Sequence, residues 1–173
     1  MCPEGAAGDE PLRGSGRRPL LPAEKGVYAV CFRLEGPVEI RDRRGRALAK
    51  AEAGYLIYVG SAGGPGGIRA RVSRHLRGPQ RVWWHIDSVS SSPLARPVFI
   101  YYEVGRYGRP AEDGLASYIE PLEGLFPLGM AGATDSLRPH MFYCKDPGAI
   151  AEALARRGGT LWWCGDEGKG RDL

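Results

Sequence analysis

The sequence contains no long apolar run, and this absence narrows the class of protein. No apolar segment approaches the roughly 18 residues that a membrane-spanning helix needs. The opening Met-Cys-Pro-Glu-Gly lacks the basic and then apolar layout of a signal peptide. We therefore expect a cytoplasmic protein that makes no membrane contact. A chain of 173 residues, 43% of them hydrophobic, is long enough for one domain with its own core.

Cysteines are few, at positions 2, 31, 144 and 164, and no pair has the CxxC spacing of a zinc knuckle. Cys31 lies in an apolar, strand-like run and is predicted to be a small core residue. Cys144 and Cys164 could lie close together in the fold, and the sequence leaves open whether they pair. The glycine-rich segment 63–67 lacks the GxxxxGK[ST] pattern of a P-loop, and the chain has no internal repeat.

Acidic residues are missing from the most basic stretch of the chain. Residues 69–81 contain five arginines and one histidine but no acid, and residues 41–50 hold four arginines and one lysine against Asp42. The net charge is only +4, while the isoelectric point is about 9.0. Clustered cations of this kind suit a polyanionic partner such as nucleic acid. From composition alone, a solvated basic surface is the simpler interpretation.

The chain is predicted to form one domain between two loose ends. Residues 1–21, rich in glycine, proline and arginine, predict a disordered basic arm, and residues 165–173 predict a flexible tail. Residues 22–164 carry the folded domain. Strand-like and helix-like segments are interspersed in it, which predicts an α/β (α+β) layered fold.

The expected elements follow from hydrophobic periodicity and from turn residues. Strands are predicted over residues 27–34, 37–40, 54–60, 97–104, 139–144 and 160–164, with a turn over 43–46. Helices are predicted from Ile68 up to Gly78, over residues 112–123, and from the N-cap Asp146 to Arg157. The segment Trp83–Asp87 is predicted to lead into another extended stretch.

Two tyrosines in separate strand runs, Tyr28 and Tyr58, are the first candidates for chemistry. If their strands are neighbours, both hydroxyls could face one site. A tyrosine with its usual pKa near 10 is a poor base at pH 7, but nearby arginines or a metal would favour the phenolate. The alternative is that both are ordinary half-buried strand tyrosines.

The predicted helix after the glycine segment carries Arg71, Arg74 and His75, and Arg71 and His75 share a face because they are four residues apart. An arginine fork suits the oxygens of a phosphate. The helix N-terminus and the glycine loop could add backbone donors to the same anion. The alternative is a solvated basic helix.

Glu112 opens a later helix and is a candidate ligand for a divalent ion, since one carboxylate with waters and substrate phosphates is a normal magnesium arrangement. Glu120 and Glu123 compete for that role. The alternative for Glu112 is an acid favoured by the helix dipole. His140, before a predicted strand, is interpreted as structural.

The segment Trp83–Asp87 combines two tryptophans with His85 and an acid. His85 could bind phosphate or move a proton, and Trp83 or Trp84 could stack on a base. Alternatively, the tryptophans pack in the core while His85 and Asp87 orient each other.

In their order, Gly26-Val27-Tyr28, Tyr58-Val59-Gly60 and the arginine-rich helix resemble the GIY-YIG nuclease superfamily. Most of residues 26–144 resemble one branch of it, a small domain that is sometimes fused to a base-excision repair endonuclease. The segments Trp84–Asp87, Glu112 with Leu115-Ala116, and Ser136–His140 carry the rest of the resemblance, although Asp113 stands where this branch is expected to have cysteine.

The resemblance implies a small mixed, mostly antiparallel sheet flanked by helices, and an active site that uses Mg²⁺ or Mn²⁺. It assigns the general base to Tyr58, the shaping of the site to Tyr28 with His75, phosphate binding to Arg71, and the metal to Glu112. Further contacts to nucleic acid are expected from Gly60, Arg69, Arg74, Arg77, Arg81, Trp84 and His85.

The leading hypothesis is therefore a divalent-metal-dependent endonuclease that acts on DNA, including branched or damaged DNA, in repair. One rival is a nucleic-acid-binding module without catalysis, for which the basic clusters and Trp83-Trp84 suffice. A second rival is an adaptor that binds a repair enzyme. The nuclease hypothesis requires the tyrosines, Arg71 and a carboxylate to converge.

Overall fold

A computed structural model describes residues 20–129 and 139–165 of the chain. The arm predicted over residues 1–21 lies outside the described residues except for its last two, and the tail predicted over 165–173 except for its first. Residues 130–138, which include Ser136 of the resemblance, also lie outside them.

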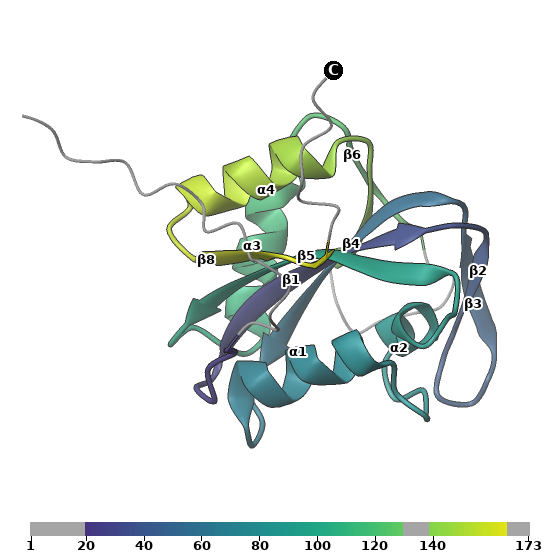
Figure 1. The fold of residues 1–173 in the computed structure, drawn as a ribbon, viewed down its shortest axis with the longest axis horizontal. Coiled ribbons are helices and arrows are strands. Elements are labelled where there is room, and N and C mark those ends of the chain that lie inside the picture. The colour runs from purple at the N-terminus through teal and green to yellow at the C-terminus, as the bar shows by residue number, and fades with distance from the viewer. Residues whose placement is uncertain (1–19, 130–138, 166–173) are drawn as a thin grey trace, which may run out of the picture.

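One antiparallel sheet of six strands forms the centre of the molecule, in the order β6-β7-β4-β1-β5-β8 (Figure 1). Its strands are β1 (Gly26–Leu34), β4 (Gly54–Ala62), β5 (Ala95–Val104), β6 (Leu125–Pro127), β7 (Met141–Cys144) and β8 (Thr160–Trp163). All neighbouring pairs run antiparallel. Strand β1 lies between β4 and β5 and is buried along most of its length, which explains its nearly continuous apolar sequence.

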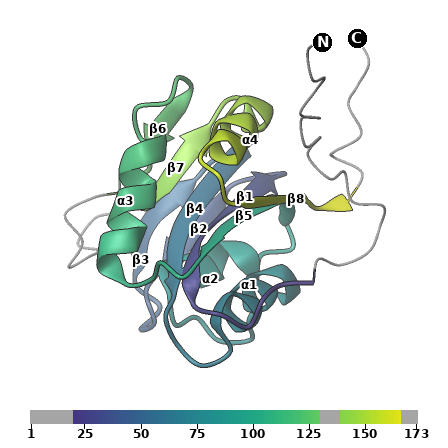
Figure 2. The same cartoon turned by 90° about the vertical axis from the view of Figure 1, so that its left-hand side faces the viewer.

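Helices cover both faces of this sheet. Helices α1 (Gly67–Arg77) and α2 (His85–Ser90) lie on one face, and α3 (Arg109–Ile119) and α4 (Pro147–Arg156) lie on the other, as the two views show (Figures 1 and 2). Ile68 and Val72 of α1 belong to one core cluster, and Leu115 and Ile119 of α3 to the other. The predicted α+β fold, a single domain with a mostly antiparallel sheet and flanking helices, is confirmed.

Two short strands, β2 (Val38–Arg41) and β3 (Ala47–Ala51), form a hairpin outside the main sheet. The strand over 37–40 and the turn over 43–46 were predicted, whereas β3 was not, because its Ala-Leu-Ala-Lys-Ala sequence lacks the β-branched and aromatic residues of a typical strand. Strand β6, only three residues long, was also not predicted.

The prediction for Trp83–Asp87 is wrong. This segment leads into helix α2 and not into a strand. Asp87, three residues after the N-cap Trp84, accepts the backbone N–H of Trp84 at 3.1 Å, which stabilises the first turn. The helix predicted over 112–123 is α3, which begins earlier, at Arg109, and ends at Ile119.

The helix start at Asp146 is confirmed, since its carboxylate accepts the N–H groups of Gly148 and Ala149. Cys31 is buried in the core as predicted, and Cys144 and Cys164 are free thiols and do not pair. No helix within the described ranges is long and apolar enough to cross a membrane.

Candidate functional site

Tyr28 on β1 and Tyr58 on β4 lie side by side on one face of the sheet. Tyr28 is opposite Gly60, and Tyr58 is opposite Val30. Because alternate residues of a strand share a face, both phenol rings point to the same side. Their centroids are 6.2 Å apart, and both rings pack in the core cluster that includes α1 and α2. The prediction that these two strands are neighbours is confirmed.

Gly60 makes room for the two rings. A Cβ at residue 60 would lie 2.6 Å from Oη of Tyr28 and 2.8 Å from Cε1 of Tyr58, so a side chain there would displace the rings. Gly60 is buried, so the expectation that it contacts nucleic acid is wrong in this fold. Its absent side chain is what allows the tyrosines to approach each other.

Burial decides the protonation state of both phenols. It raises the pKa of Tyr58 well above its usual value, the Glu112 carboxylate raises it further, and the Arg71 guanidinium lowers it. The pKa of Tyr28 is also raised well above its usual value, first by burial and then by Tyr58. Arg71 does favour the phenolate as expected, since it lowers the pKa of both phenols, but the effect of burial is larger and the net shift is upward. Both tyrosines are neutral hydroxyls at pH 7.

His75 on α1 links the tyrosine pair, Tyr28 and Tyr58, to the buried Asp87. Its Nε2 lies 2.8 Å from Oη of Tyr28, in a buried hydrogen bond. Burial lowers the pKa of His75 to about 4, so the ring is neutral at pH 7. Its Nδ1 faces Oδ1 of Asp87 at 3.9 Å, and both atoms are buried without a hydrogen-bond partner in the described residues. We assign the ring proton to Nδ1, since a proton there faces a carboxylate and leaves Nε2 to accept from Tyr28.

Asp87 is a site residue that the sequence did not reveal. It is fully buried, and its Oδ2 accepts the backbone N–H of Trp83 at 2.9 Å, that of Trp84 at 3.1 Å, and Nη2 of Arg74 at 2.8 Å. The alternative in which His85 and Asp87 orient each other is therefore wrong. An acid three residues after a helix N-cap is a recognisable capping signal, but its position behind His75 depends on how α2 packs.

Arg71 is positioned by Trp84. The guanidinium carbon of Arg71 lies 3.8 Å from the centroid of the Trp84 ring, in a cation–π contact. Both residues line a cavity of about 230 Å³ between the end of β4 and the start of α1. Trp84 is 42% exposed, and its ring covers one face of the Arg71 guanidinium.

The N-terminus of α1 is not available to an anion, in contrast to the expectation from the sequence. The amides of residues 67–70 donate to carbonyls of residues 22–24 and of the glycine loop 64–66. Gly67 has a φ of +51°, and a Cβ there would lie 2.0 Å from the carbonyl oxygen of Glu24. The glycine loop therefore serves close packing of the chain, and a phosphate at this site would depend on Arg71 for its donors.

Glu112 approaches the tyrosines from α3. The start of this helix is tied to β4, since Oγ of Ser61 accepts the N–H of Gly108 at 2.6 Å. Oε1 of Glu112 lies 3.0 Å from Nδ1 of His140, and Nε2 of His140 lies 3.1 Å from Oδ1 of Asp113. Burial lowers the pKa of His140, but its contacts with Glu112 and Asp113 outweigh that effect and raise the pKa. His140 is thus part of the site.

The competing carboxylates lie at and beyond the C-terminal end of α3. Glu120 is the C-cap of this helix and Glu123 follows it. Glu120 is eight positions after Glu112, which corresponds to about 12 Å along the helix axis. Of these three carboxylates, Glu112 is the one whose charge raises the pKa of both tyrosines.

The oxygen atoms at this site fit a hard cation. Within the described residues, no group of three or more His, Cys, Asp or Glu side chains could hold a metal ion, so a closed zinc-type site is not formed there. The site offers the Glu112 carboxylate, whose charge acts on the two phenol hydroxyls. Mg²⁺ and Mn²⁺ take oxygen ligands, and Mg²⁺ keeps several waters and commonly uses one carboxylate with substrate phosphates.

The remaining arginines predicted to bind nucleic acid divide into two groups. Arg69 and Arg74 are engaged inside the protein, since Nε of Arg69 donates to the carbonyl of Leu21 at 2.8 Å and Arg74 is held by Asp87. Arg77 and Arg81 are exposed. The structure therefore separates anchoring arginines from those that solvent can reach.

His85 is also apart from the hydrogen-bonded pair of Tyr28 and His75. It is half-buried at the start of α2, where burial lowers its pKa and the charge of Asp42 acts in the opposite direction. Asp42 belongs to the β2–β3 turn, and α2 is hydrogen-bonded to this hairpin through Ser88 and Arg41.

Comparison with known proteins finds one family. Residues 27–162, most of the chain, match the model of a family described as "Domain of unknown function DUF123". No curated protein and no solved structure matches the chain.

Proposed function

We propose that this chain, which belongs to the DUF123 family, is a divalent-metal-dependent endonuclease of the GIY-YIG type that hydrolyses DNA phosphodiesters in repair. One observation carries the proposal. Tyr28, Tyr58, Arg71 and Glu112 come from four different elements, and both Arg71 and Glu112 lie close enough to shift the pKa of each phenol. Two hydroxyls, a guanidinium and a carboxylate at one place are the groups that phosphodiester hydrolysis needs.

Arg71 is the residue that binds the phosphate. Its planar fork matches two phosphate oxygens, and the Trp84 ring beneath it holds it in one orientation. A guanidinium that is already ordered loses less side-chain entropy when the phosphate binds. It also offsets the charge that develops on the phosphoryl oxygens.

The direction of the hydrogen bonds explains how a neutral Tyr58 can assist the attacking water. With the ring proton of His75 assigned to Nδ1, Tyr28 donates its proton to Nε2 of His75. The Tyr58 ring lies next to that of Tyr28, so in the proposed substrate complex Tyr58 donates to the Tyr28 oxygen and accepts a hydrogen bond from the attacking water. As that water attacks, its proton passes to Tyr58, the Tyr58 proton to Tyr28, and the Tyr28 proton to His75. The Asp87 carboxylate stabilises the imidazolium that results.

Glu112 would hold the metal ion, with waters and a substrate phosphate completing its ligands. Mg²⁺ or Mn²⁺ bound there would supply positive charge to the phosphoryl oxygens and lower the pKa of a bound water. The Glu112 carboxylate is paired with His140, whose other ring nitrogen contacts Asp113.

The test is a cleavage assay with matched variants. The wild-type protein is incubated with duplex, single-stranded, branched and damaged DNA, in the presence of Mg²⁺ or Mn²⁺ and with a chelator as control. We expect metal-dependent cleavage that Tyr58→Phe abolishes. Tyr55→Phe is the control, since Tyr55 is on the same strand and packs against the opposite core cluster. Absence of cleavage of every substrate by the wild type would overturn the proposal.

A second candidate function is a nucleic-acid-binding module without catalysis. The raised pKa of Tyr58 and the engagement of Glu112 by His140 favour it, because both reduce the readiness of the site for chemistry. It predicts DNA binding with a steep salt dependence and no cleavage. An adaptor for a repair enzyme would instead bind DNA weakly and retain a protein partner.

A further inference from the structure

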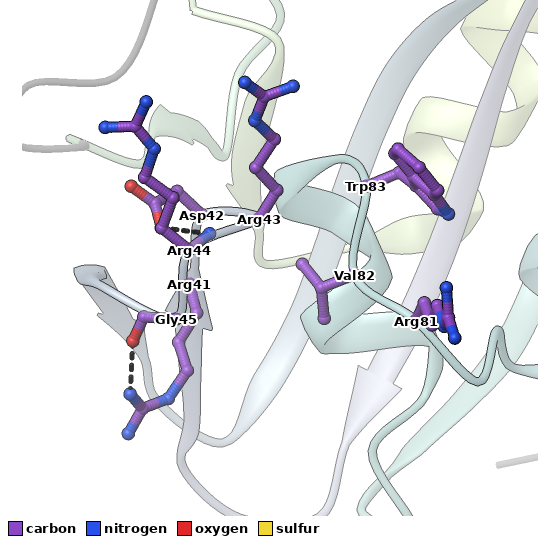
Figure 3. Close-up of a pocket in the computed structure, with 8 residues that line it drawn as sticks. All are labelled: Arg41, Asp42, Arg43, Arg44, Gly45, Arg81, Val82 and Trp83. Atoms are coloured by element: carbon purple, nitrogen blue, oxygen red, sulfur yellow. Dashed lines mark hydrogen bonds between the residues drawn. The ribbon is translucent and has the colours of Figure 1, made fainter.

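A second cavity, of about 540 Å³, lies away from the tyrosines, between the turn of the β2–β3 hairpin and the segment that precedes α2 (Figure 3). Its volume is within the range of about 300–1,000 Å³ that is usual for ligand pockets. Figure 3 shows the hairpin turn on one side and Arg81, Val82 and Trp83 on the other, with Val82 drawn closest to the hairpin. The lining consists of Arg41, Asp42, Arg43, Arg44, Gly45, Arg81, Val82 and Trp83.

Three guanidinium groups at this cavity remain available. The side chains of Arg43, Arg44 and Arg81 are exposed, and within the described residues no hydrogen bond or ion pair of these guanidinium groups is found. Arg41 differs from them, because Nη1 donates to the carbonyl of Gly45 at 2.6 Å and Nη2 pairs with Glu39.

The one acid in the lining does not cancel this charge. The Asp42 carboxylate accepts the backbone N–H of Arg44 at 2.8 Å and that of Arg46 at 2.9 Å, and it pairs with the Arg46 guanidinium at 3.3 Å. It is thereby occupied in shaping the turn. Exposed arginines that line a cavity whose acid is already paired form an anion-binding surface.

The hairpin is fixed relative to α2. The backbone N–H of Arg41 donates to Oγ of Ser88 at 3.0 Å, and this hydroxyl donates back to the carbonyl of Arg41 at 3.4 Å. Ile40, next to Arg41, is buried in the core cluster that also contains Ile86. The two walls of the cavity are therefore joined by packing and hydrogen bonds.

Trp83 adds an aromatic face to the cations. Its side chain is 56% exposed, which is unusual for so large an apolar residue and leaves its ring open to a ligand. The next residue, Trp84, stacks on Arg71 of the first site. A strand bound at Arg71 could thus continue past Trp84 to Trp83 and the hairpin.

We propose that this cavity is a second nucleic-acid subsite, which holds an unpaired strand outside the catalytic site. One base stacks on Trp83, and the phosphates beside it bind Arg43, Arg44 and Arg81. An unpaired strand fits better than a duplex, because base faces are buried between neighbouring bases in a duplex and only an unpaired base can stack on an indole. The subsite would select DNA that has a single-stranded branch, flap or gap next to the cleaved bond.

The identification of the ligand as nucleic acid rests on the proposed function, but the experiment measures binding alone, without catalysis. A fluorescent oligothymidylate and a duplex of the same length are titrated by anisotropy in a chelator. Two variants are compared with wild type: the double variant Arg43→Ala/Arg44→Ala, and Trp83→Ala. Trp83→Phe is the conservative control for the ring. Arg156→Ala is the control for charge, since it removes an exposed arginine from α4 on the opposite side of the sheet. Circular dichroism confirms that each variant is folded.

We expect Trp83→Ala to weaken binding of the unpaired oligonucleotide roughly 5- to 150-fold, the range that corresponds to the loss of one stacked base. Trp83→Phe should retain much of the affinity. The double arginine variant should lower the slope of log K against log salt by about 0.7 for each lost phosphate contact. Arg156→Ala should change neither quantity, and the duplex should lose less affinity than the unpaired strand.

Equal affinity of wild type and the folded variants for the unpaired strand would overturn the proposal. So would equal losses for duplex and unpaired strand, or displacement of the oligonucleotide by polyglutamate of the same charge, since that result would indicate a general polyanion surface. A protein that lacks cleavage activity but shows the predicted losses would contradict the proposed nuclease and leave this subsite standing.

Discussion

Nδ1 of His75 and Oδ1 of Asp87 face each other 3.9 Å apart in the interior, and both atoms are buried without a hydrogen-bond partner in the described residues. A buried polar atom that lacks a partner costs about 1–3 kcal/mol. Two such atoms that face each other reduce this cost if the ring proton lies between them. This arrangement selects the tautomer of His75 and thereby the direction of its hydrogen bond with Tyr28.

The first prediction concerns this tautomer. In wild-type protein at pH 7, ¹⁵N chemical shifts should show that Nδ1 of His75 carries the proton. Asp87→Asn can present an amide N–H to Nδ1, which would move the proton to Nε2 and reverse the hydrogen bond with Tyr28. We expect cleavage to fall by at least tenfold while DNA binding is kept. Protonation of Nε2 in the wild type would contradict the assignment.

The second prediction is a loss of stability in acid that depends on His75. Burial lowers the pKa of His75 from 6.5 to about 4, so the unfolded chain binds this proton more readily than the folded chain between these values. The contribution of His75 to the free energy of unfolding is therefore complete above pH 6.5 and falls as the pH drops toward 4. The loss amounts to about 3 kcal/mol, at about 1.4 kcal/mol per pH unit.

Urea unfolding at several pH values measures this effect. His75→Gln cannot titrate, so its stability should decline less between pH 6.5 and 4 than that of the wild type. His140→Gln is the comparison, because the pKa of His140 is raised and its contribution is lost as the pH rises. Parallel curves for wild type and His75→Gln in the acid range would contradict the prediction.

The third prediction concerns Gly60. A Cβ at this position would lie 2.6 Å from the Tyr28 hydroxyl, so Gly60→Ala should lower the free energy of unfolding by about 1–3 kcal/mol and move both rings. Gly114→Ala is a matched control, since a Cβ at this exposed position in α3 would meet nothing within 4 Å. It should raise stability by about 0.5–1 kcal/mol. Thermal melts of both variants test the contrast, and an unaffected Gly60→Ala would contradict the ring packing.

The fourth prediction concerns the pair of Glu112 and His140. The raised pKa of His140 means that its ring carries more positive charge near neutral pH than an ordinary histidine, which opposes cation binding at Glu112. His140→Gln should therefore bind Mn²⁺ several-fold more tightly, as measured by electron paramagnetic resonance. Glu112→Gln should bind it more weakly. Weaker binding in His140→Gln would indicate instead that the histidine mainly orients the carboxylate.

Much of the fold was predictable from local patterns. The apolar runs over residues 27–34 and 54–60, the helix after the glycine loop and the N-cap at Asp146 correspond to β1, β4, α1 and α4, because each depends on neighbours within a few residues. Local rules failed at residues 83–87. Their aromatic and β-branched composition suggested a strand, but a helix begins at His85 and Asp87 caps its first turn.

The candidate site was only partly predictable. Tyr28, Tyr58, Arg71, His75 and Glu112 were identified from motif order, and they do lie near one another. Their partners Asp87 and His140 were not, because 12 residues separate Asp87 from His75 and 28 separate His140 from Glu112. Contacts over such distances arise from how helices dock on the sheet.

The sequence alone determined which residues form strands and helices and which side chains have suitable chemistry, because these properties are local. The tertiary structure decided the protonation of Tyr58 and His75, the loss of the α1 amides as anion donors, and the opening of a cavity beside Trp83. All three depend on burial and on the approach of distant segments, since a pKa or a free donor is set by whatever packs around it.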